Sequence, residues 1–438
     1  DRVWSYWGGN IRKGEDGKYH LMVCGWLEAS PKGHMEWRNS WVFNTVSDNL
    51  TGPFKPVNII GKGHNPEMFQ AKDGRYVLYV IDGRYVADDI NGKWEYGKFD
   101  FNARDRRIIE GLSNLSFAQR EDSSYVMVCR GGGIWISRDG LSEYNQLTDR
   151  RVYPDVKGRF EDPVIWRDHI QYHLIVNDWL GRIAFYLRSK DGVNWVTDPG
   201  EAYMPGVAVH EDGHSEGWFK YERLKMYQDK YGRAIQANFA VIDTLKHEDK
   251  PFDNHSSKNI SIPLNPGLLL TVLNDKPITA GTKTIRLKVQ AEEGFHPQTD
   301  ISSLRFGASE EVNYGRGSKV LKTENDGNDL IITFDGKGNG ITEKEFAPKL
   351  IGRYKNGKML YGYARLPYVD YVEPILSARA PVFSESQKGW NGNIEVQNFG
   401  QVSSQKASVK IEYKKEGKMV KVASAAVPAL KPYEKADI

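Results

Sequence analysis

Short polar windows with carboxylates, histidine and arginine recur along the first 262 residues, each just before a short apolar segment. The windows are Trp7–Asn10, His64–Glu67, Ser113–Ser116, Glu161–Pro163 and Glu222–Arg223. Cleavage of a glycosidic bond needs one group that protonates the departing oxygen and another that activates water or attacks the sugar. The residue types in these windows are typical of that chemistry.

A second set of windows follows at the ends of the next apolar segments, and a polar loop spans His210–Trp218. Aromatic faces stack on sugar rings, and arginine binds a carboxylate or sulfate. The candidate catalytic residues are Asp162, Glu161, His214 and Glu222. The candidate substrate-binding residues are His64, Glu67, Asp82, Arg130, Asp178, Trp179, Trp26 and His210. No phosphate loop, zinc-type spacing or Ser-His-Asp signature accompanies them.

The elements that must position these residues form a repeat. Pairs of apolar segments recur with a tyrosine after the turn, and these tyrosines are roughly 50 residues apart, enough for one four-stranded sheet per period. They are Tyr19, Tyr76, Tyr125 and Tyr172. Five periods predict a five-bladed β-propeller over residues 1–262, whose first and last blades we expect to share strands. Because innermost strands converge on the axis, we expect the polar windows to line one pocket.

The rest of the chain predicts two further β-domains, so the fold class is all-β. Residues 265–375 show short alternating strands typical of a β-sandwich. Residues 380–438 predict a second, immunoglobulin-like sandwich that resembles a CARDB-type module. The segment Ser189–Trp195 resembles the Asp-box of sialidase blades, and we interpret it as a structural turn.

Charge and hydropathy exclude several classes of partner. The chain has 60 Lys and Arg against 57 Asp and Glu, which gives a net charge of +3 and no basic run for nucleic acid. The longest apolar stretch, near Leu268–Leu273, is too short to span a bilayer. Two cysteines cannot build a disulfide framework. The residue types of the polar windows make an oligosaccharide or polysaccharide the expected partner.

The windows resemble those of the five-bladed glycoside hydrolases of family 43 and, more closely, family 117, whose exo-acting members release 3,6-anhydro-L-galactose from agar oligosaccharides. That resemblance implies an inverting mechanism with an Asp base, a second Asp, a Glu, and a His general acid eight residues before the Glu. His214 and Glu222 have this spacing, and Asp162 matches the blade-four Asp. The resemblance also implies no required cofactor, allows a structural Ca²⁺ in the propeller channel, and implies a secreted, periplasmic or cell-surface bacterial protein.

The chain departs from that pattern in blade one, where Trp7–Asn10 stand in place of the family's Asp base. Glu67, Asp82 or Asp178 could supply the base instead. The leading hypothesis is an exo-acting glycoside hydrolase that trims terminal sugars from plant or algal oligosaccharides. A polysaccharide lyase, with Arg130 neutralising a uronate, is one alternative. A glycan-binding protein without catalysis is the other.

Overall fold

The computed structural model describes residues 3–255, 257–292, 299–387 and 389–438. In these ranges the chain is almost entirely β-structure, and its helical segments are α1 (Ser309–Asn313), η1 (Gly33–Asn39) and η2 (Ile301–Ser303). None of the described helices is long and apolar enough to cross a membrane. The predicted all-β class is confirmed.

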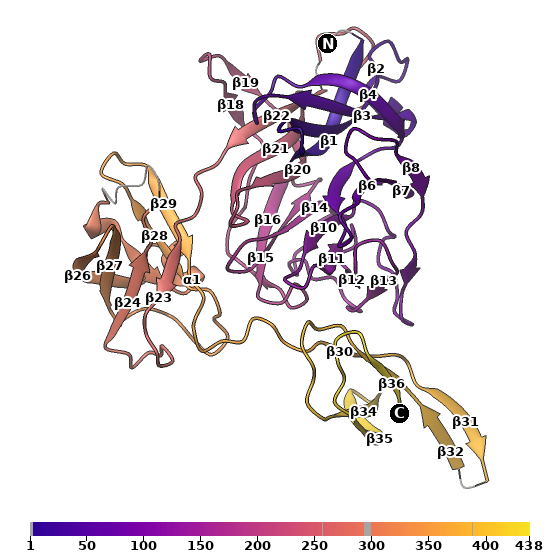
Figure 1. Ribbon diagram of the computed structural model, residues 1–438, viewed down its shortest axis with the longest axis vertical. Coiled ribbons are helices and arrows are strands. Elements are labelled where there is room, and N and C mark those ends of the chain that lie inside the picture. Colours follow the sequence, from indigo (N-terminus) through magenta and orange to yellow (C-terminus); the bar gives the residue numbers. More distant parts are fainter. Residues whose placement is uncertain (1–2, 256, 293–298, 388) are drawn as a thin grey trace. The chain divides into compact units, whose positions relative to one another are not determined.

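Within the described residues, five sheets follow one another along the chain as the blades of a β-propeller, and their strands pair antiparallel except for β9 with β13; Figure 1 labels many of these strands. Blade one has β1 (Trp4–Lys13), β2 (Tyr19–Leu27), β3 (Trp41–Ser47) and β4 (Lys55–Lys62); blade two has β5 (Glu67–Gln70), β6 (Tyr76–Val80), β7 (Gly83–Ala87) and β8 (Glu95–Gly97). Blade three has β10 (Ser116–Gln119), β11 (Tyr125–Val128), β12 (Ile134–Ser137) and β13 (Tyr144–Gln146), joined by β9 (Phe101–Asn102). Blade four has β14 (Phe160–Arg167), β15 (Tyr172–Asp178), β16 (Ile183–Ser189) and β17 (Val196–Thr197). Blade five has β20 (Lys220–Gln228), β21 (Ala234–Ile242) and β22 (Ser257–Pro263), preceded by the hairpin of β18 (Val207–Val209) and β19 (Ser215–Gly217).

The predicted repeat is confirmed at the start of the second strand of four blades. β2, β6, β11 and β15 begin at Tyr19, Tyr76, Tyr125 and Tyr172. The Asp-box-like segment is a turn: Ser189 Oγ accepts the Gly192 N–H at 2.9 Å, and Asp191 Oδ1 accepts the Val193 N–H at 2.8 Å. These bonds satisfy backbone donors between β16 and β17, which is a structural role.

The chain separates into two compact units, and each is described by itself. The first unit comprises residues 1–66 and 153–369, and the second comprises residues 67–152 and 370–438. Blades one, four and five therefore lie in the first unit together with the first appended domain. Blades two and three lie in the second unit together with the C-terminal segment.

The expectation that the first and last blades share strands is wrong for the described residues, because the sheet of blade five contains only β20, β21 and β22. Instead, β1 packs directly beside these strands (Figure 1). The side chain of Asn259 on β22 accepts the Gly8 N–H at 2.9 Å and donates to the Gly8 carbonyl at 3.0 Å. One amide side chain thus makes the pair of bonds that a neighbouring strand would make.

The first appended domain is a sheet folded over its own core. Its strands are β23 (Leu270–Val272), β24 (Thr284–Val289), β25 (Arg305–Gly307), β26 (Ser318–Asp326), β27 (Asp329–Asp335), β28 (Lys349–Arg353) and β29 (Met359–Tyr363), in the order β23-β24-β27-β26-β25-β28-β29. Buried side chains from both halves, such as Leu287, Phe334, Phe306 and Leu350, form one cluster. Two layers around one core are what the predicted sandwich requires.

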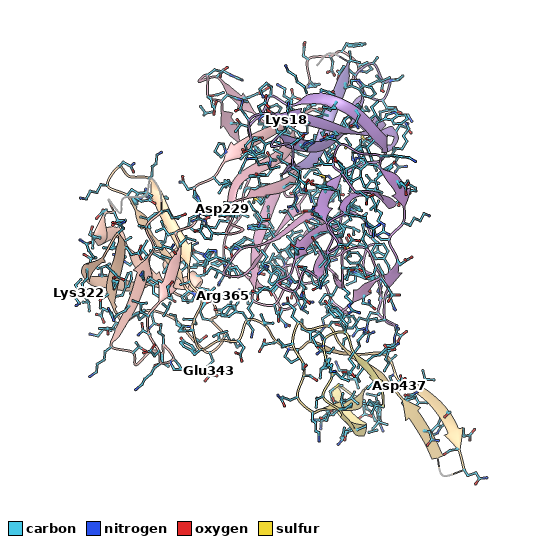
Figure 2. The ribbon with its side chains drawn as sticks, in the orientation of Figure 1. Lys18, Asp229, Lys322, Glu343, Arg365 and Asp437 are labelled. Carbon is cyan, nitrogen blue, oxygen red and sulfur yellow. The ribbon has the colours of Figure 1, made fainter. Side chains whose placement is uncertain are left out.

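Arginines from blades four and five hold this domain. Arg188, 1% exposed, donates to Asp198 Oδ1 at 2.8 Å and to the Ala347 carbonyl at 3.1 Å. Arg233 donates to the Gly267 carbonyl at 2.7 Å, and Asp229 lies 2.7 Å from the same guanidinium. From the other side, Arg365 donates to the Ile170 carbonyl at 2.8 Å. Figure 2 labels Asp229 and Arg365.

The second unit repeats this device at its C-terminal segment, which contains β30 (Leu376–Ala378), β31 (Val382–Ser386), β32 (Gly389–Asn393), β33 (Glu395–Asn398), β34 (Ala407–Lys415), β35 (Lys418–Val427) and β36 (Lys435–Asp437). Arg104, 2% exposed, donates to Glu395 at 3.1 Å and to the Ser377 carbonyl at 2.9 Å. Arg120 donates to the Phe399 carbonyl at 2.9 Å. The immunoglobulin-like identity of this segment stays a prediction.

Replacing the bridging amide tests the closure between blades one and five. We expect Asn259→Ala to lower the free energy of unfolding by about 2 kcal/mol, because the N–H and C=O of Gly8 lose their partners. The measurement is urea unfolding followed by tryptophan fluorescence. Asn391→Ala on the exposed strand β32 is the control, and equal stability of the two variants would contradict this role.

Candidate functional site

Each innermost strand has a left-handed backbone residue, which lies within the strand in β1, β14 and β20 and two residues before it in β5 and β10. The φ values are 65° at Gly8, 57° at Asn65, 51° at Asn114, 54° at Asp162 and 54° at Arg223. In β1, β14 and β20 the strand register shifts at these points. A bulge of this kind breaks the strict alternation of side chains and re-aims them. Each polar window therefore contains a residue with left-handed backbone.

Two of these residues meet in the first unit, where β14 and β20 lie side by side (Figure 1). Arg223 Nη1 lies 2.5 Å from Asp162 Oδ1, and the Arg223 N–H donates to Asp162 Oδ2 at 3.4 Å. Asp162 is 5% exposed. Left-handed backbone at an arginine costs about 1 kcal/mol or more. Strain of this kind is concentrated at functional sites in proteins.

The neighbouring carboxylate, Glu222, is held by two lysines. It is 1% exposed, its Oε1 lies 3.4 Å from Lys220 Nζ, and its Oε2 accepts a hydrogen bond from Lys246 Nζ. Burial alone would oppose ionisation, but the ammonium groups of Lys246 and Lys220 outweigh it and lower the pKa of Glu222 to about 2. Glu222 is therefore ionised at neutral pH.

The pKa of Asp162 is shifted in the opposite direction to that of Glu222. Burial raises the pKa of its carboxyl to about 7; the Arg223 guanidinium opposes the rise, and the carboxylates of Glu161 and Glu222 add to it. Two carboxyl groups in one cluster thus have pKa values separated by their surroundings. Such a separation distinguishes a proton donor from a group that stays charged.

Tryptophan rings lie beside both lysines of this cluster. Lys220 Nζ is 5.1 Å from the centroid of the Trp179 ring, and Lys246 Nζ is 5.0 Å from that of Trp7. A cation over an aromatic face is stabilised by about 0.5 kcal/mol or more. The rings therefore help hold the lysines against Glu222.

Two neutral histidines line the same cluster. His34 on η1 is 1% exposed, and its ring packs edge-on against Trp7 and Trp26, with centroids 4.5 and 4.9 Å away. Burial, with Lys246 nearby, lowers its pKa to about 3. His64, buried beside Ser40 at 3.0 Å, has a pKa well below its usual value because of burial and Arg223. Neither imidazole adds charge at neutral pH.

The remaining first-unit candidates have mixed surroundings. Trp26 is 2% exposed and lies among these rings rather than on the surface. Asp178 Oδ1 accepts the N–H groups of Arg159 at 3.0 Å and Leu180 at 3.2 Å, which is a turn-forming role. Glu161 is half-buried on the bulge that carries Asp162. The structure thus brings together Asp162, Glu222 and their cations, with Glu161 directly adjacent in the chain.

Three predicted binding residues belong to the second unit. Glu67 Oε1 accepts Ser116 Oγ–H at 3.1 Å and the Phe117 N–H at 2.9 Å, which links blades two and three. Asp82 has φ of 70° in the tight turn between β6 and β7. Arg130, half-buried, follows β11, and its N–H donates to the Ser113 carbonyl at 3.0 Å.

His210 and His214 lie on the β18–β19 hairpin. Their rings stack with centroids 4.1 Å apart, and His214 Nδ1 is 2.6 Å from Asp212 Oδ1. The His214 side chain is 56% exposed. Its surroundings differ sharply from the buried cluster of Asp162 and Glu222.

Three residues of the cluster, His34, Lys220 and Lys246, were not predicted from the sequence. Lys220 is the first residue of β20. His34 comes from the insertion between β2 and β3, and Lys246 from the loop after β21. Neither segment belongs to the repeat. The one available signal was the mixture of histidine and tryptophan in Gly33–Asn39.

A separate cavity of about 970 Å³ lies between the faces of blades one and five. Aromatic side chains and a few charged ones line it, including Trp4, Phe239, Glu28 and His255. None of the predicted site residues lines this cavity. The carboxylates that line the cavity, Glu28 and Asp253, are half-buried, whereas Asp162 and Glu222 are buried.

The donor set around Asp162 does not fit the Ca²⁺ that the resemblance allows. Calcium takes six to eight oxygen ligands. Here the carboxylates of Asp162 and Glu222 are paired with Arg223, Lys220 and Lys246. A divalent cation would meet three positive charges.

No family profile and no curated protein matches the chain. Similar solved structures include a family 117 glycoside hydrolase from Zobellia galactanivorans, at 12% identity and a TM-score of 0.44, covering 60% of this chain and 84% of that one. An α-L-arabinofuranosidase from Lactobacillus brevis has 11% identity and a TM-score of 0.42, covering 60% and 91%. An endo-arabinase from Bacteroides thetaiotaomicron has 12% and 0.37, covering 59% and 94%. Identities and TM-scores this low do not establish a function, so the function is inferred from the geometry of the site.

Infrared difference spectra test the protonation of Asp162. In spectra of the wild type minus Asp162→Asn, we expect the carbonyl band of a protonated carboxyl to persist and to disappear only as pH rises through about 7. Because the folded pKa exceeds the unfolded one, this group's contribution makes folding less favourable as pH rises from about 4 to about 7. Asp162→Asn should flatten that part of the stability profile.

Glu222→Gln provides the matched comparison. Its difference spectrum should show a carboxylate band at every pH well above about 2, because the lysines hold Glu222 ionised. Loss of the Asp162 band by about pH 5 would show that Arg223 outweighs burial.

Proposed function

We propose that the chain is a glycoside hydrolase in which Asp162 donates the proton to the departing oxygen. The observation that supports this is the separation of two buried carboxyl groups, with the pKa of Asp162 raised to about 7 and that of Glu222 lowered to about 2. A general acid works best when its pKa lies near the operating pH. Asp162, rather than the exposed His214, is the better candidate for this role.

Glu161 is the proposed base. It is half-buried, adjacent to Asp162 on the bulge, and nearer to solvent than Glu222. In the proposed step Glu161 takes a proton from water, the water oxygen attacks the anomeric carbon, and the glycosidic bond breaks. Asp162 protonates the leaving oxygen, and Arg223 stabilises the carboxylate that remains. Burial keeps the proton on Asp162, and the charged Glu222 adds to this effect by repulsion.

Exo action with inversion on plant or algal oligosaccharides completes the proposal. A water-activating base is what an inverting enzyme needs. Because such glycans lie outside cells, the proposal places the protein in the periplasm, on the surface or in the surroundings of a bacterium. Proton NMR of the first-formed anomer tests inversion, and release of monosaccharide alone tests exo action.

A glycan-binding protein without catalysis is the second candidate. It is favoured by the ion pairs of Asp162 with Arg223 and of Glu222 with Lys246, since buried carboxylates also occur in structural networks. Binding without product release on arabinan-, xylan-, galactan- and agar-derived oligosaccharides would favour it. An unsaturated product would instead indicate a lyase.

Two variants test the catalytic assignment on whichever oligosaccharide of that panel is cleaved. We expect Asp162→Asn and Glu161→Gln each to lower kcat/KM about 100- to 10,000-fold, because each removes one proton-transfer group. Asp48→Asn, whose side chain is 84% exposed, is the control and should retain full activity.

The leaving group separates the two roles. In a dinitrophenyl glycoside of the same sugar, the dinitrophenolate leaves without being protonated. Asp162→Asn should therefore recover most of its activity on this substrate, whereas Glu161→Gln should not. Equal losses on both substrates for Asp162→Asn would remove Asp162 from the acid role.

The pH profile offers an independent check. We expect kcat/KM to fall as pH rises through about 7, because Asp162 then loses its proton. In Lys246→Met this alkaline limb should move upward by about one pH unit or less, since the ammonium that lowers the pKa of Asp162 is gone. A downward shift would contradict the assignment.

A further inference from the structure

The β18–β19 hairpin places three metal-binding side chains on one face. Ala208 pairs with Glu216 and Val209 with Ser215, and the turn closes with the His210 N–H donating to the His214 carbonyl at 2.9 Å. His214 and Glu216 are two residues apart, so they share a face, and His210 stands across the turn from His214. One ligand atom from each of His210, His214 and Glu216 lies within 4.8 Å of the others.

The hydrogen bonds of the hairpin leave the Nε2 atoms of His210 and His214 able to bind a metal ion. Asp212 Oδ1 lies 2.6 Å from His214 Nδ1, so the proton sits on Nδ1 and Nε2 keeps its lone pair. His210 Nε2 is shielded from solvent and has no hydrogen-bond partner among the residues that the structure describes. Glu216 Oε2 lies 3.4 Å from that nitrogen, and Lys258 holds the other oxygen of Glu216 at 3.1 Å.

A second carboxylate that fixes the tautomer of a ligating histidine is a common feature of metal centres. Asp212 has this position relative to His214. Two imidazoles and one carboxylate suit zinc and leave a fourth position for water, whereas calcium and magnesium prefer oxygen ligands. Zinc bonds of about 2.0–2.1 Å need ligand atoms about 3.3 Å apart, so side chains whose ligand atoms lie up to 4.8 Å apart must move closer together when zinc binds.

We propose that His210, His214 and Glu216 form a binding site for Zn²⁺. The metal replaces the contact between His210 and Glu216, and Asp212 and Lys258 orient two of its ligands. It links the two strands of the hairpin directly before β20, the strand that carries Glu222. The proposal is independent of the chemistry assigned to Asp162.

Zinc titration of the full chain tests the site. We expect one Zn²⁺ per chain by calorimetry, and a loss of affinity of at least about 10-fold in His210→Ala and in His214→Ala. Asp212→Asn should bind about 10-fold more weakly with unchanged stoichiometry, because it loses only the orienting group. His247→Ala, an exposed histidine outside the hairpin, is the matched control.

Cobalt substitution reports the geometry. Co²⁺ in the wild type should give the intense visible bands of a four-coordinate site, and these should be absent in His214→Ala while far-UV circular dichroism is unchanged. Binding of equal affinity in the wild type and both histidine variants would overturn the proposal, as would the absence of zinc binding by the wild type.

Discussion

The left-handed backbone residue in or just before each innermost strand is the constraint on which the candidate site depends. In a regular strand, Glu161 and Asp162 would point to opposite faces. The bulge removes that alternation and brings the Asp162 carboxylate to 2.5 Å from the guanidinium of Arg223, itself a left-handed residue on the next innermost strand. Asparagine and aspartate tolerate this backbone better than most side chains do, which accounts for the residue types at Asn65, Asn114 and Asp162.

Electrostatics then separates two chemically similar acids. Glu222 faces the ammonium groups of Lys246 and Lys220 and the guanidinium of Arg223, whereas Asp162 faces Arg223 and Lys246 but also two carboxylates. Burial penalises both charges, so the number and sign of the neighbours decide which acid keeps its proton. The Trp179 and Trp7 rings lie against Lys220 and Lys246 and help to hold these lysines beside Glu222.

The sequence predicts those parts of the molecule that are local and periodic. The turn tyrosines mark four of the second strands, and the polar window with Glu161 and Asp162 marks the innermost strand of blade four. Both signals can be read from the sequence because each is complete within a few residues. His34 and Lys246 come from irregular insertions, whose course depends on what they pack against. The amide of Asn259 reaches Gly8 across the whole propeller sequence, and no short-range pattern records such a pairing. The spacing between His214 and Glu222 does not reveal that a separate hairpin carries His214.

The arginine contacts of the appended domains have one further consequence. Many of their acceptors are main-chain carbonyls, such as those of Ala347, Gly267, Ser377 and Phe399. Guanidinium groups keep their charge at any physiological acidity, and amide oxygens do not titrate. Mild acidification can therefore change the protonation of the buried carboxyl cluster while these anchoring contacts persist. The groups that respond to pH are thus different from the groups that hold the appended domains in place.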